Sequence, residues 1–302
     1  MTEKNNPLLY FPDEMLHISL MDGQVRVLLC RTTSVTRAMA AIHAPSPVAT
    51  AACSRIMTGT LMLSVMMKGE NESVTVTVAG SGPAGKITCV GNGAHVKISP
   101  ENPSYSLPPR RDGHLDVGGY IGRTGRLTVI KDLGLKEPYI GQCALVSGEI
   151  GEDFAQYYTV SEQKPSLVAL GALVHEGVCL SSGGILIQPL PGCPDWLIDE
   201  LELRSMLFSA ISREVADMSL DDLYRRWFDG LSPTLLDRQS LFYKCDCSRD
   251  RMERALISMG KTELRSLIDE DGHAELTCHF CRKAQYFTKE QLEDLLERAQ
   301  RD

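Results

Sequence analysis

Short apolar runs rich in β-branched residues mark the first two thirds of the chain. They predict strands over residues 25–29, 73–79, 87–90, 127–131 and 166–174. Two helices are expected near the start, over residues 32–42 and 48–68. The second is apolar nearly all round, so we expect it to be buried and to end at Gly69. Antiparallel strands with a few helices predict an α+β domain with a mixed sheet over residues 1–193.

The pattern changes after residue 194, where strand-like runs give way to helical spacing and many charges. Residues 195–217 are interpreted as one helix and residues 219–229 as a second. Ser219 is expected to be the N-cap of the second helix, with Asp222 at the capping-box position. One face of this helix carries Leu220, Leu223, Tyr224 and Trp227. Residues 194–240 are therefore predicted to form a helical linker, and two amphipathic helices that only connect domains are its simplest account.

The remaining residues, 241–302, are predicted to form a small C-terminal α+β unit. Its expected helices are one from the N-cap Ser248 to Met259, one from the N-cap Thr262 to about Glu270, and one that begins at Thr288 with Gln291. Its expected strands are residues 274–277 and 283–287.

Composition and charge narrow the class of protein. The chain has 302 residues, enough for roughly two domains, and 43% of them are hydrophobic against 23% charged. That balance is typical of a globular protein rather than a disordered one. The net charge of −8 argues against a protein that binds nucleic acid or anionic membranes in bulk, because both attract basic surfaces. Residues 195–240 contain ten acidic residues and five Arg. Most of the net negative charge therefore lies in the linker.

Two features bear on the compartment. Apolar runs stop well short of the roughly 20 residues that cross a bilayer. The stretch from Met1 to Asn6 is polar and has no apolar signal core behind it. We therefore expect a cytoplasmic protein. In a reducing cytoplasm, its ten cysteines favour metal binding or redox chemistry over a resting disulfide scaffold.

The cysteines fall into two groups. Six are scattered singly, at Cys30, Cys53, Cys89, Cys143, Cys179 and Cys193. The first five lie in apolar or strand-like contexts, where a free cysteine behaves as a small buried hydrophobe. Cys193 stands at the entrance to the linker, where it is either a spare thiol that scrambles disulfides or, more simply, inert. The other four form two close pairs, Cys245-Asp-Cys247 and Cys278-His-Phe-Cys281.

The two close pairs predict one structural zinc site. Four thiolates supply a complete tetrahedral ligand set, and a Cys-x-x-Cys turn aims two sulfurs at one point. His273 and His279 are nearby spare donors, but four sulfurs already complete the set. A unit of about sixty residues has a marginal core, whereas a structural zinc supplies an apparent ~10–16 kcal/mol of folding free energy. Metal loss should therefore unfold the unit.

The same thiolates are open to oxidation. Peroxide and hypochlorite attack thiolates, so oxidation to two disulfides would remove the zinc ligands. Four basic residues flank the cysteines, and they either keep the thiols deprotonated or are solvated surface charges: Lys244, Arg249, Arg282 and Lys283. The spacing permits this redox chemistry without requiring it, since most four-cysteine zinc sites are purely structural.

One motif suggests nucleotide binding. Residues 80–86 (Gly-Ser-Gly-Pro-Ala-Gly-Lys) match most of a phosphate-binding loop. That loop also needs Ser or Thr next and a helix behind it, whereas Ile87 follows here and begins a strand-like run. We expect a glycine-rich hairpin turn instead.

The residues around the paired cysteines resemble one family. The stretches that carry the resemblance are 243–251 (Tyr-Lys-Cys-Asp-Cys-Ser-Arg-Asp-Arg), 256–261 (Leu-Ile-Ser-Met-Gly-Lys), 268–272 (Ile-Asp-Glu-Asp-Gly) and 278–281 (Cys-His-Phe-Cys). Upstream, it extends to 128–134, 147–153, 161–166 and 183–188. The chain thus resembles the 33 kDa heat-shock protein family of redox-regulated holdase chaperones over nearly its whole length.

The resemblance implies a mechanism. In that family zinc is held by the equivalents of Cys245, Cys247, Cys278 and Cys281 when the protein is reduced and inactive. Oxidants convert neighbouring cysteines to disulfides, here Cys245–Cys247 and Cys278–Cys281. The zinc domain and the linker then unfold and expose apolar surface that captures unfolding client proteins under stress, without ATP and commonly as a homodimer. The helices of residues 195–229 would then be a metastable switch over the N-terminal domain.

Two other classes of function remain. A nucleic-acid-binding zinc module is disfavoured, because residues 241–302 carry 11 Lys+Arg against 13 Asp+Glu. A thiol–disulfide oxidoreductase would place Cys-x-x-Cys at a helix N-terminus, whereas a strand is predicted after Cys281. The sequence predicts no catalytic residues.

Overall fold

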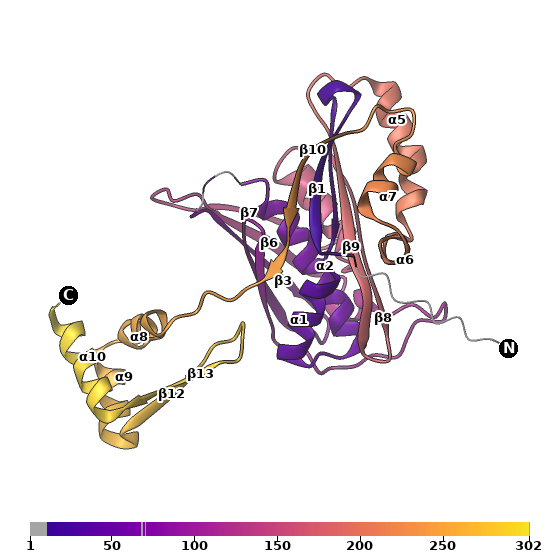
Figure 1. The fold of residues 1–302 in the computed structure, drawn as a ribbon. Coiled ribbons are helices and arrows are strands. Elements are labelled where there is room, and N and C mark those ends of the chain that lie inside the picture. Colours follow the sequence, from indigo (N-terminus) through magenta and orange to yellow (C-terminus); the bar gives the residue numbers. More distant parts are fainter. Residues whose placement is uncertain (1–10, 68, 70, 302) are drawn as a thin grey trace. The chain divides into compact units, whose positions relative to one another are not determined.

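The structure is a computed structural model that describes residues 11–67, 69 and 71–301 (Figure 1). Its internal contacts divide the chain into two compact units, Met1–Lys244 and Cys245–Asp302. Residues 194–240 pack with the first unit. The division by function into residues 1–193, 194–240 and 241–302 stays a prediction. The polar start from Met1 to Asn6 lies outside the described residues.

Two sheets form the frame of the first unit. The first sheet has the strand order β10-β1-β2-β9-β8, and the second has the order β11-β5-β4-β3-β6-β7. The strands of the first sheet are β1 (Glu14–Leu20), β2 (Val25–Arg31), β8 (Leu167–His175), β9 (Val178–Pro189) and β10 (Thr234–Ser240). Those of the second are β3 (Ser73–Gly80), β4 (Lys86–Asn92), β5 (His95–Pro100), β6 (Gly125–Asp132), β7 (Tyr139–Ala144) and β11 (Phe242–Tyr243).

Period-two alternation gives the first sheet two apolar faces. In β1, Met15 joins the core between the two sheets, whereas Leu16 and Ile18 point into a second core on the opposite face. The helix α2 (Pro47–Ser64) fills the space between the sheets, and nearly every side chain along it is buried. The apolar run predicted this burial, and all five strands predicted from the sequence are present. The α+β class is confirmed.

The second core lies under the linker. It joins the outer face of the first sheet to three helices, α5 (Asp195–Arg204), α6 (Ile211–Asp217) and α7 (Leu220–Trp227). Figure 1 shows these helices along the first sheet, on the side away from α2. The predicted apolar face of α7 is confirmed, since its four residues are all buried. Ser219 caps α7 as expected, accepting a hydrogen bond from the backbone N–H of Asp222.

Three predicted elements in the first unit differ in detail. Residues 195–217 are not one helix, because a 3-10 turn, η2 (Ser205–Phe208), separates α5 from α6. The predicted helical linker also ends in a strand, β10, which completes the first sheet beside β1. The helix α2 ends at Ser64 rather than Lys68, where the Ser64 hydroxyl donates to the Gly93 carbonyl of the β4–β5 turn.

Glycines in β8 and β9 explain why α6 lies so close to the first sheet. A Cβ atom on Gly171 would lie 2.9 Å from Ile211 Cγ2 and 3.0 Å from the backbone nitrogen of Ser212. Two polar side chains of the sheet then hold α6. Ser181 donates to the carbonyl of Ser212, and Arg31 donates to the carbonyls near the end of α6. These contacts require the backbone of α6 to lie directly on the sheet. The chain therefore changes direction at η2 instead of continuing α5 as one straight helix.

The remaining helices of the first unit are α1 (Thr33–His43), α3 (Val117–Ile121) and α4 (Gly151–Val160), with a 3-10 turn η1 (Met21–Gly23) between β1 and β2. Only α1 among them was predicted. The glycine-rich residues 80–86 join β3 to β4 as an antiparallel hairpin with Ala79 opposite Lys86. The phosphate-binding alternative is therefore wrong, because no helix follows this turn.

The second unit is a small α+β fold. It contains α8 (Arg249–Ser258), α9 (Lys261–Ser266), a π-helical turn η3 (Leu267–Asp271), the hairpin β12 (His273–Thr277) and β13 (Ala284–Thr288), and α10 (Lys289–Arg301). Ser248 caps α8 as predicted, accepting from the backbone of Arg251. The N-cap of α9 is Gly260 rather than Thr262, because Gly260 at a φ of 102° both ends α8 and redirects the chain.

Candidate metal centre

The turn between β12 and β13 holds the second cysteine pair. The backbone N–H of Arg282 donates to the Cys278 carbonyl at 2.8 Å, and that of Cys278 donates to the Lys283 carbonyl at 3.0 Å. Arg282 takes a φ of 57° to close the turn. These bonds fold the chain tightly between Cys278 and Cys281, so both thiols project from the same end of the hairpin.

The first pair precedes α8. Ser248, next to Cys247, is the N-cap of α8, so the start of the helix sets the position of Cys247. Cys247 and Cys278 both pack against the core of the second unit. The buried part of that core is small: Met252, Leu256, Leu264, Ile268, Ala274, Phe287, Leu292 and Leu295. The two pairs therefore meet at the border of a core that has little apolar surface of its own.

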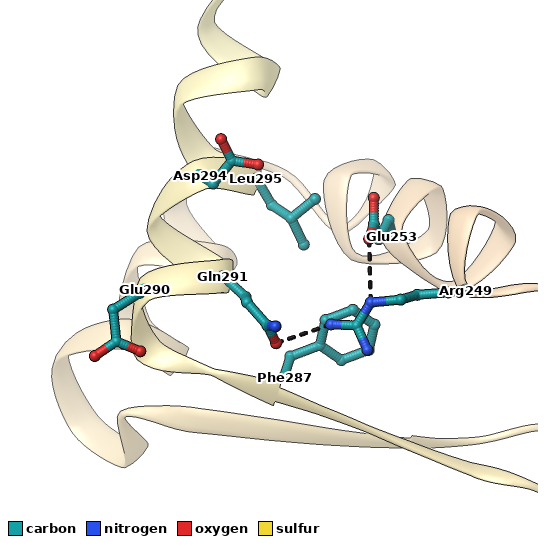
Figure 2. A pocket seen from close by; sticks show the side chains of 7 residues that line it. All are labelled: Arg249, Glu253, Phe287, Glu290, Gln291, Asp294 and Leu295. Carbon is teal, nitrogen blue, oxygen red and sulfur yellow. Dashed lines mark hydrogen bonds and ion pairs between the residues drawn. The ribbon is translucent and has the colours of Figure 1, made fainter.

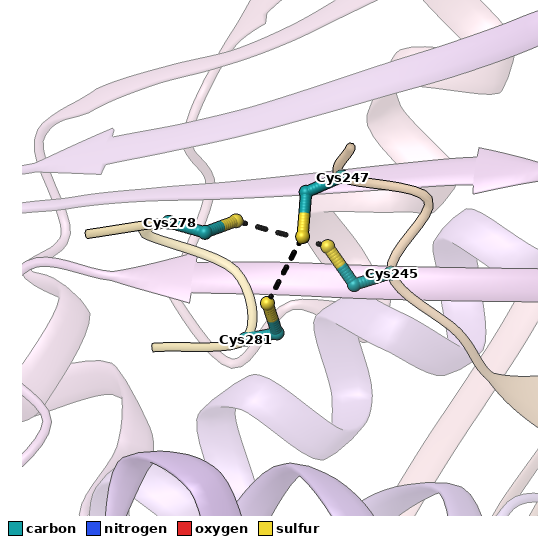
Figure 3. Close-up of side chains that lie close together, drawn as sticks. All are labelled: Cys245, Cys247, Cys278 and Cys281. Carbon is teal, nitrogen blue, oxygen red and sulfur yellow. Dashed lines mark hydrogen bonds between the residues drawn. The ribbon is translucent and has the colours of Figure 1, made fainter. Parts of the chain in front are cut away.

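All four sulfur atoms lie within 4.8 Å of one another (Figure 3). Two contacts cross between the pairs: Cys245 Sγ lies 3.7 Å from Cys278 Sγ, and Cys247 Sγ lies 3.3 Å from Cys281 Sγ. Both distances exceed the ~2.05 Å of a disulfide bond, and all four cysteines are free. A tetrahedral zinc ion with bonds of ~2.3 Å would hold sulfurs ~3.8 Å apart. The four thiols fit such an ion.

The electrostatics of the cluster also suit a cation. Burial raises the pKa of the Cys245 and Cys247 thiols. The neighbouring thiols raise the pKa of Cys247 further, whereas at Cys245 hydrogen bonds with Cys247 partly offset the shift. Burial acts in the same direction on Cys278, but hydrogen bonds from the backbone N–H groups of Cys281 and Phe280 outweigh it and lower its pKa. The backbone therefore stabilises the thiolate of Cys278, whereas burial opposes further negative charge on Cys245 and Cys247. A divalent cation would offset that charge.

The histidines predicted as spare donors do not belong to the cluster. Among the described residues, the group that could hold a metal contains the four cysteines alone. His273 Nδ1 lies 2.9 Å from the Asp271 carbonyl, and the ring stacks on Tyr286 with centroids 5.5 Å apart.

Comparisons with known proteins show which family the chain belongs to. The family model described as "Hsp33 protein" matches residues 13–288. The chain belongs to the Hsp33 family. A 33 kDa chaperonin of Alkaliphilus metalliredigens is 40% identical over 286 residues, covering 94% of this chain and 98% of that protein. One from Clostridium perfringens is 41% identical over 289 residues, covering 94% of this chain and 92% of that protein.

A solved structure shares the fold. The crystal structure of the 33 kDa chaperonin of Thermotoga maritima superposes with a TM-score of 0.88 at 31% identity, covering 97% of this chain and all of that one. Membership of the Hsp33 family supports a chaperone function. In the part of the chain that the structure describes, no helix is both long and apolar enough to cross a membrane.

Arg249 joins parts of the second unit that are far apart in the sequence. Its guanidinium lies 4.4 Å from the centre of the Phe287 ring and donates to Gln291 Oε1 at 2.8 Å (Figure 2). It also pairs with Glu253 at 3.4 Å. Arg249 therefore ties the helix after Cys247 to the strand and helix after Cys281. The spacing of the sequence carries no signal for this contact, because its partners lie about forty residues away.

Five of the six scattered cysteines are buried, as the sequence predicts. Cys30, Cys53, Cys89, Cys143 and Cys179 are all buried. Burial raises the pKa of Cys53 to about 12 and that of Cys179 to about 11. Such thiols stay protonated and react slowly with oxidants. Cys193 is half-buried, and burial followed by the charge of Asp195 raises its pKa too.

Proposed function

We propose that this protein is a zinc-dependent, oxidation-activated holdase, a chaperone that binds unfolding client proteins without ATP and prevents their aggregation. The observation that carries the proposal is the convergence of Cys245, Cys247, Cys278 and Cys281, whose sulfurs lie within 4.8 Å of one another at the edge of a small core. Zinc, when bound, would cross-link the segment before α8 to the β12–β13 turn.

Oxidation removes this cross-link. Two thiolates lose two electrons and form one disulfide, while one hydrogen peroxide takes up those electrons and two protons and becomes two water molecules. Two such reactions consume all four thiolates, and a disulfide sulfur is no longer a zinc ligand. The pairing proposed from the family is Cys245–Cys247 and Cys278–Cys281. The short contacts between sulfurs join Cys245 to Cys278 and Cys247 to Cys281, so peptide mapping of the oxidised protein is the direct test of the pairing.

The linker has the features of a switch. The helices α5, α6 and α7 cover the outer apolar face of the first sheet, including Leu16, Ile18 and Val27. The linker itself is strongly charged, with ten acidic residues and five Arg in 195–240. If the linker leaves after oxidation, that sheet face becomes a large apolar surface of the kind that binds unfolded chains. Homodimer formation on oxidation belongs to the same proposal.

The alternative functions are weaker. The Cys-x-x-Cys motif lies in a hairpin turn and is followed by β13, not by a helix that would lower a thiol pKa as in an oxidoreductase. A nucleic-acid module would need a basic surface, and residues 241–302 are acidic on balance.

The test compares reduced, zinc-loaded protein with protein treated with peroxide or hypochlorite at a mildly unfolding temperature. We expect one zinc released per chain, a loss of helical circular dichroism and suppression of aggregation of a heat-unfolded client. Cys193→Ser is the matched control, because it removes a half-buried thiol outside the cluster and should leave all three responses intact. Zinc release without a gain in holding activity would refute the switch.

A further inference from the structure

A cavity in the first unit lies beside the linker. It has a volume of about 440 Å³, within the range of small-molecule sites. Its floor is formed by Leu167 of β8 and Ile187 of β9, which are cross-strand partners. Ala155 of α4 forms one wall, and Ile198 and Leu201 of α5 form the other. Most of the lining is apolar, so the cavity favours an apolar body over water.

The charges at this cavity have one sign. Glu152 of α4 and Glu202 of α5 line it, and both side chains are exposed. Within the described residues, no Lys, Arg or His lines the cavity, and neither carboxylate forms an ion pair. Two carboxylates without a counter-charge, one on each wall, repel an anionic headgroup and attract a cationic one.

We propose that this cavity, which we name the α4–α5 cavity, binds an amphiphilic cation: an alkyl chain topped by an ammonium group. The alkyl chain would lie on Leu167, Ile187 and Leu201, and the ammonium group would lie between Glu152 and Glu202. The structure holds two features that together select this class, an apolar floor and two walls that each carry an unpaired carboxylate.

The site also bears on regulation, and this part rests on the proposed function. One wall of the α4–α5 cavity is α5, the first helix of the linker, so the cavity exists only while the linker is packed on the sheet. A ligand that binds only this state shifts the equilibrium toward it by mass action. The ratio of packed to released linker rises by a factor of about 100 when the free ligand concentration is 100 times the Kd. The amphiphilic cation would therefore oppose activation.

Three probes of eight carbon atoms each test the binding: octylammonium, octan-1-ol and octanoate, each below its aggregation concentration. Titration calorimetry on reduced, zinc-loaded full-length protein should show one saturable site for octylammonium. We expect binding about tenfold weaker for the alcohol and weaker still for the carboxylate. Equal affinity for octanoate and octylammonium, or the lack of a saturable site, would overturn the proposal.

Matched variants locate the site. Glu152→Gln and Glu202→Gln should each weaken octylammonium binding about twofold to fivefold. Asp199→Asn, a charge removal on the same helix outside the lining, should leave it unchanged. Ala155→Leu should weaken all probes about tenfold, because it fills the cavity. If the two glutamine variants bind octylammonium as tightly as the parent chain, the carboxylates are not the recognition element and the proposal fails.

The regulatory part has its own readout. Octylammonium should lower the holdase activity gained after peroxide treatment of the parent chain, and should have little effect on the Glu152→Gln/Glu202→Gln double variant. Binding without that loss would keep the site and overturn its role in the switch. Oxidised protein that lacks holdase activity in the absence of any probe would instead refute the proposed function, while the titrations would still decide the site.

Discussion

The contact of Arg31 with the linker leads to a quantitative prediction. Arg31 is buried in β2, and its Nε and Nη2 atoms donate to the carbonyls of Val215 at 2.8 Å and Met218 at 2.6 Å. Both acceptors lie at the C-terminal end of α6, where helix carbonyls lack partners and carry partial negative charge. Arg31 therefore holds the end of α6 to the first sheet with two hydrogen bonds from a charged group.

Replacing Arg31 with Met should loosen α6 and leave most of the fold intact. A hydrogen bond from a charged donor contributes about 1.5–3 kcal/mol, so the loss of two should lower the free energy of opening α6 by about 3 kcal/mol or more. Opening becomes about 100-fold more frequent for that loss, since 1.4 kcal/mol is a factor of ten. Lys at position 31 keeps the charge but has no fork of donors, so Arg31→Lys should have an intermediate effect.

Amide hydrogen exchange of residues 211–218 in reduced, zinc-loaded protein measures this opening. The control is Arg37→Met, because Arg37 also donates to two backbone carbonyls, of Cys179 and Leu180, but these belong to β9 rather than the linker. We expect faster exchange in α6 for Arg31→Met only, together with partial holdase activity without oxidant. Unchanged exchange in α6, or an equal increase in the Arg37 variant, would refute the role given to Arg31.

Three further changes test other contacts. Gly171→Ala should push α6 off the sheet and raise holdase activity of the reduced protein, since its Cβ would clash with Ile211; unaltered α6 exchange would contradict this. Arg249→Lys should lower the thermal midpoint of the reduced C-terminal unit and speed zinc loss to a chelator, because the contacts with Phe287 and Gln291 need a planar fork; equal rates would contradict it. Glu162→Gln tests pH dependence. Burial acts to raise the Glu162 pKa, but hydrogen bonds from Lys131 and Tyr157 outweigh it, so its stabilisation is present above the unfolded pKa and lost as pH falls. The variant should lose about 1–3 kcal/mol in urea unfolding near pH 7 and much less near pH 3.

Much of the local structure could be predicted because its causes lie within a few residues. Ser219 and Ser248 cap helices through bonds to residues three positions later, and both predictions are confirmed. The apolar run of α2 predicted its burial for a similar reason, since a helix without a polar face is stable only inside a core. The spacing of the paired cysteines predicted that their sulfurs would meet, and they do.

Other features depended on partners far away in the chain. Nothing in residues 195–217 marks the break at η2, since Leu197, Leu201, Phe208, Ile211 and Val215 would share one face of a continuous helix. The break places α6 against Gly171, a residue of β8 that the sequence cannot connect to it. Strand β10 was missed because its position depends on pairing with β1, more than two hundred residues earlier.

The chemistry of this protein follows from its sequence alone. Four thiols stand in two close pairs, and an acidic linker connects them to an α+β domain with an apolar core. Ligand type and short-range spacing carry that information, because a turn or a helix cap is decided by neighbouring residues. How the linker is held, and which cavity it encloses, depends on tertiary contacts. The Arg31 bonds, the glycine contact and the α4–α5 cavity each join residues distant in sequence, and a side chain acquires such a partner only when the sheet has formed.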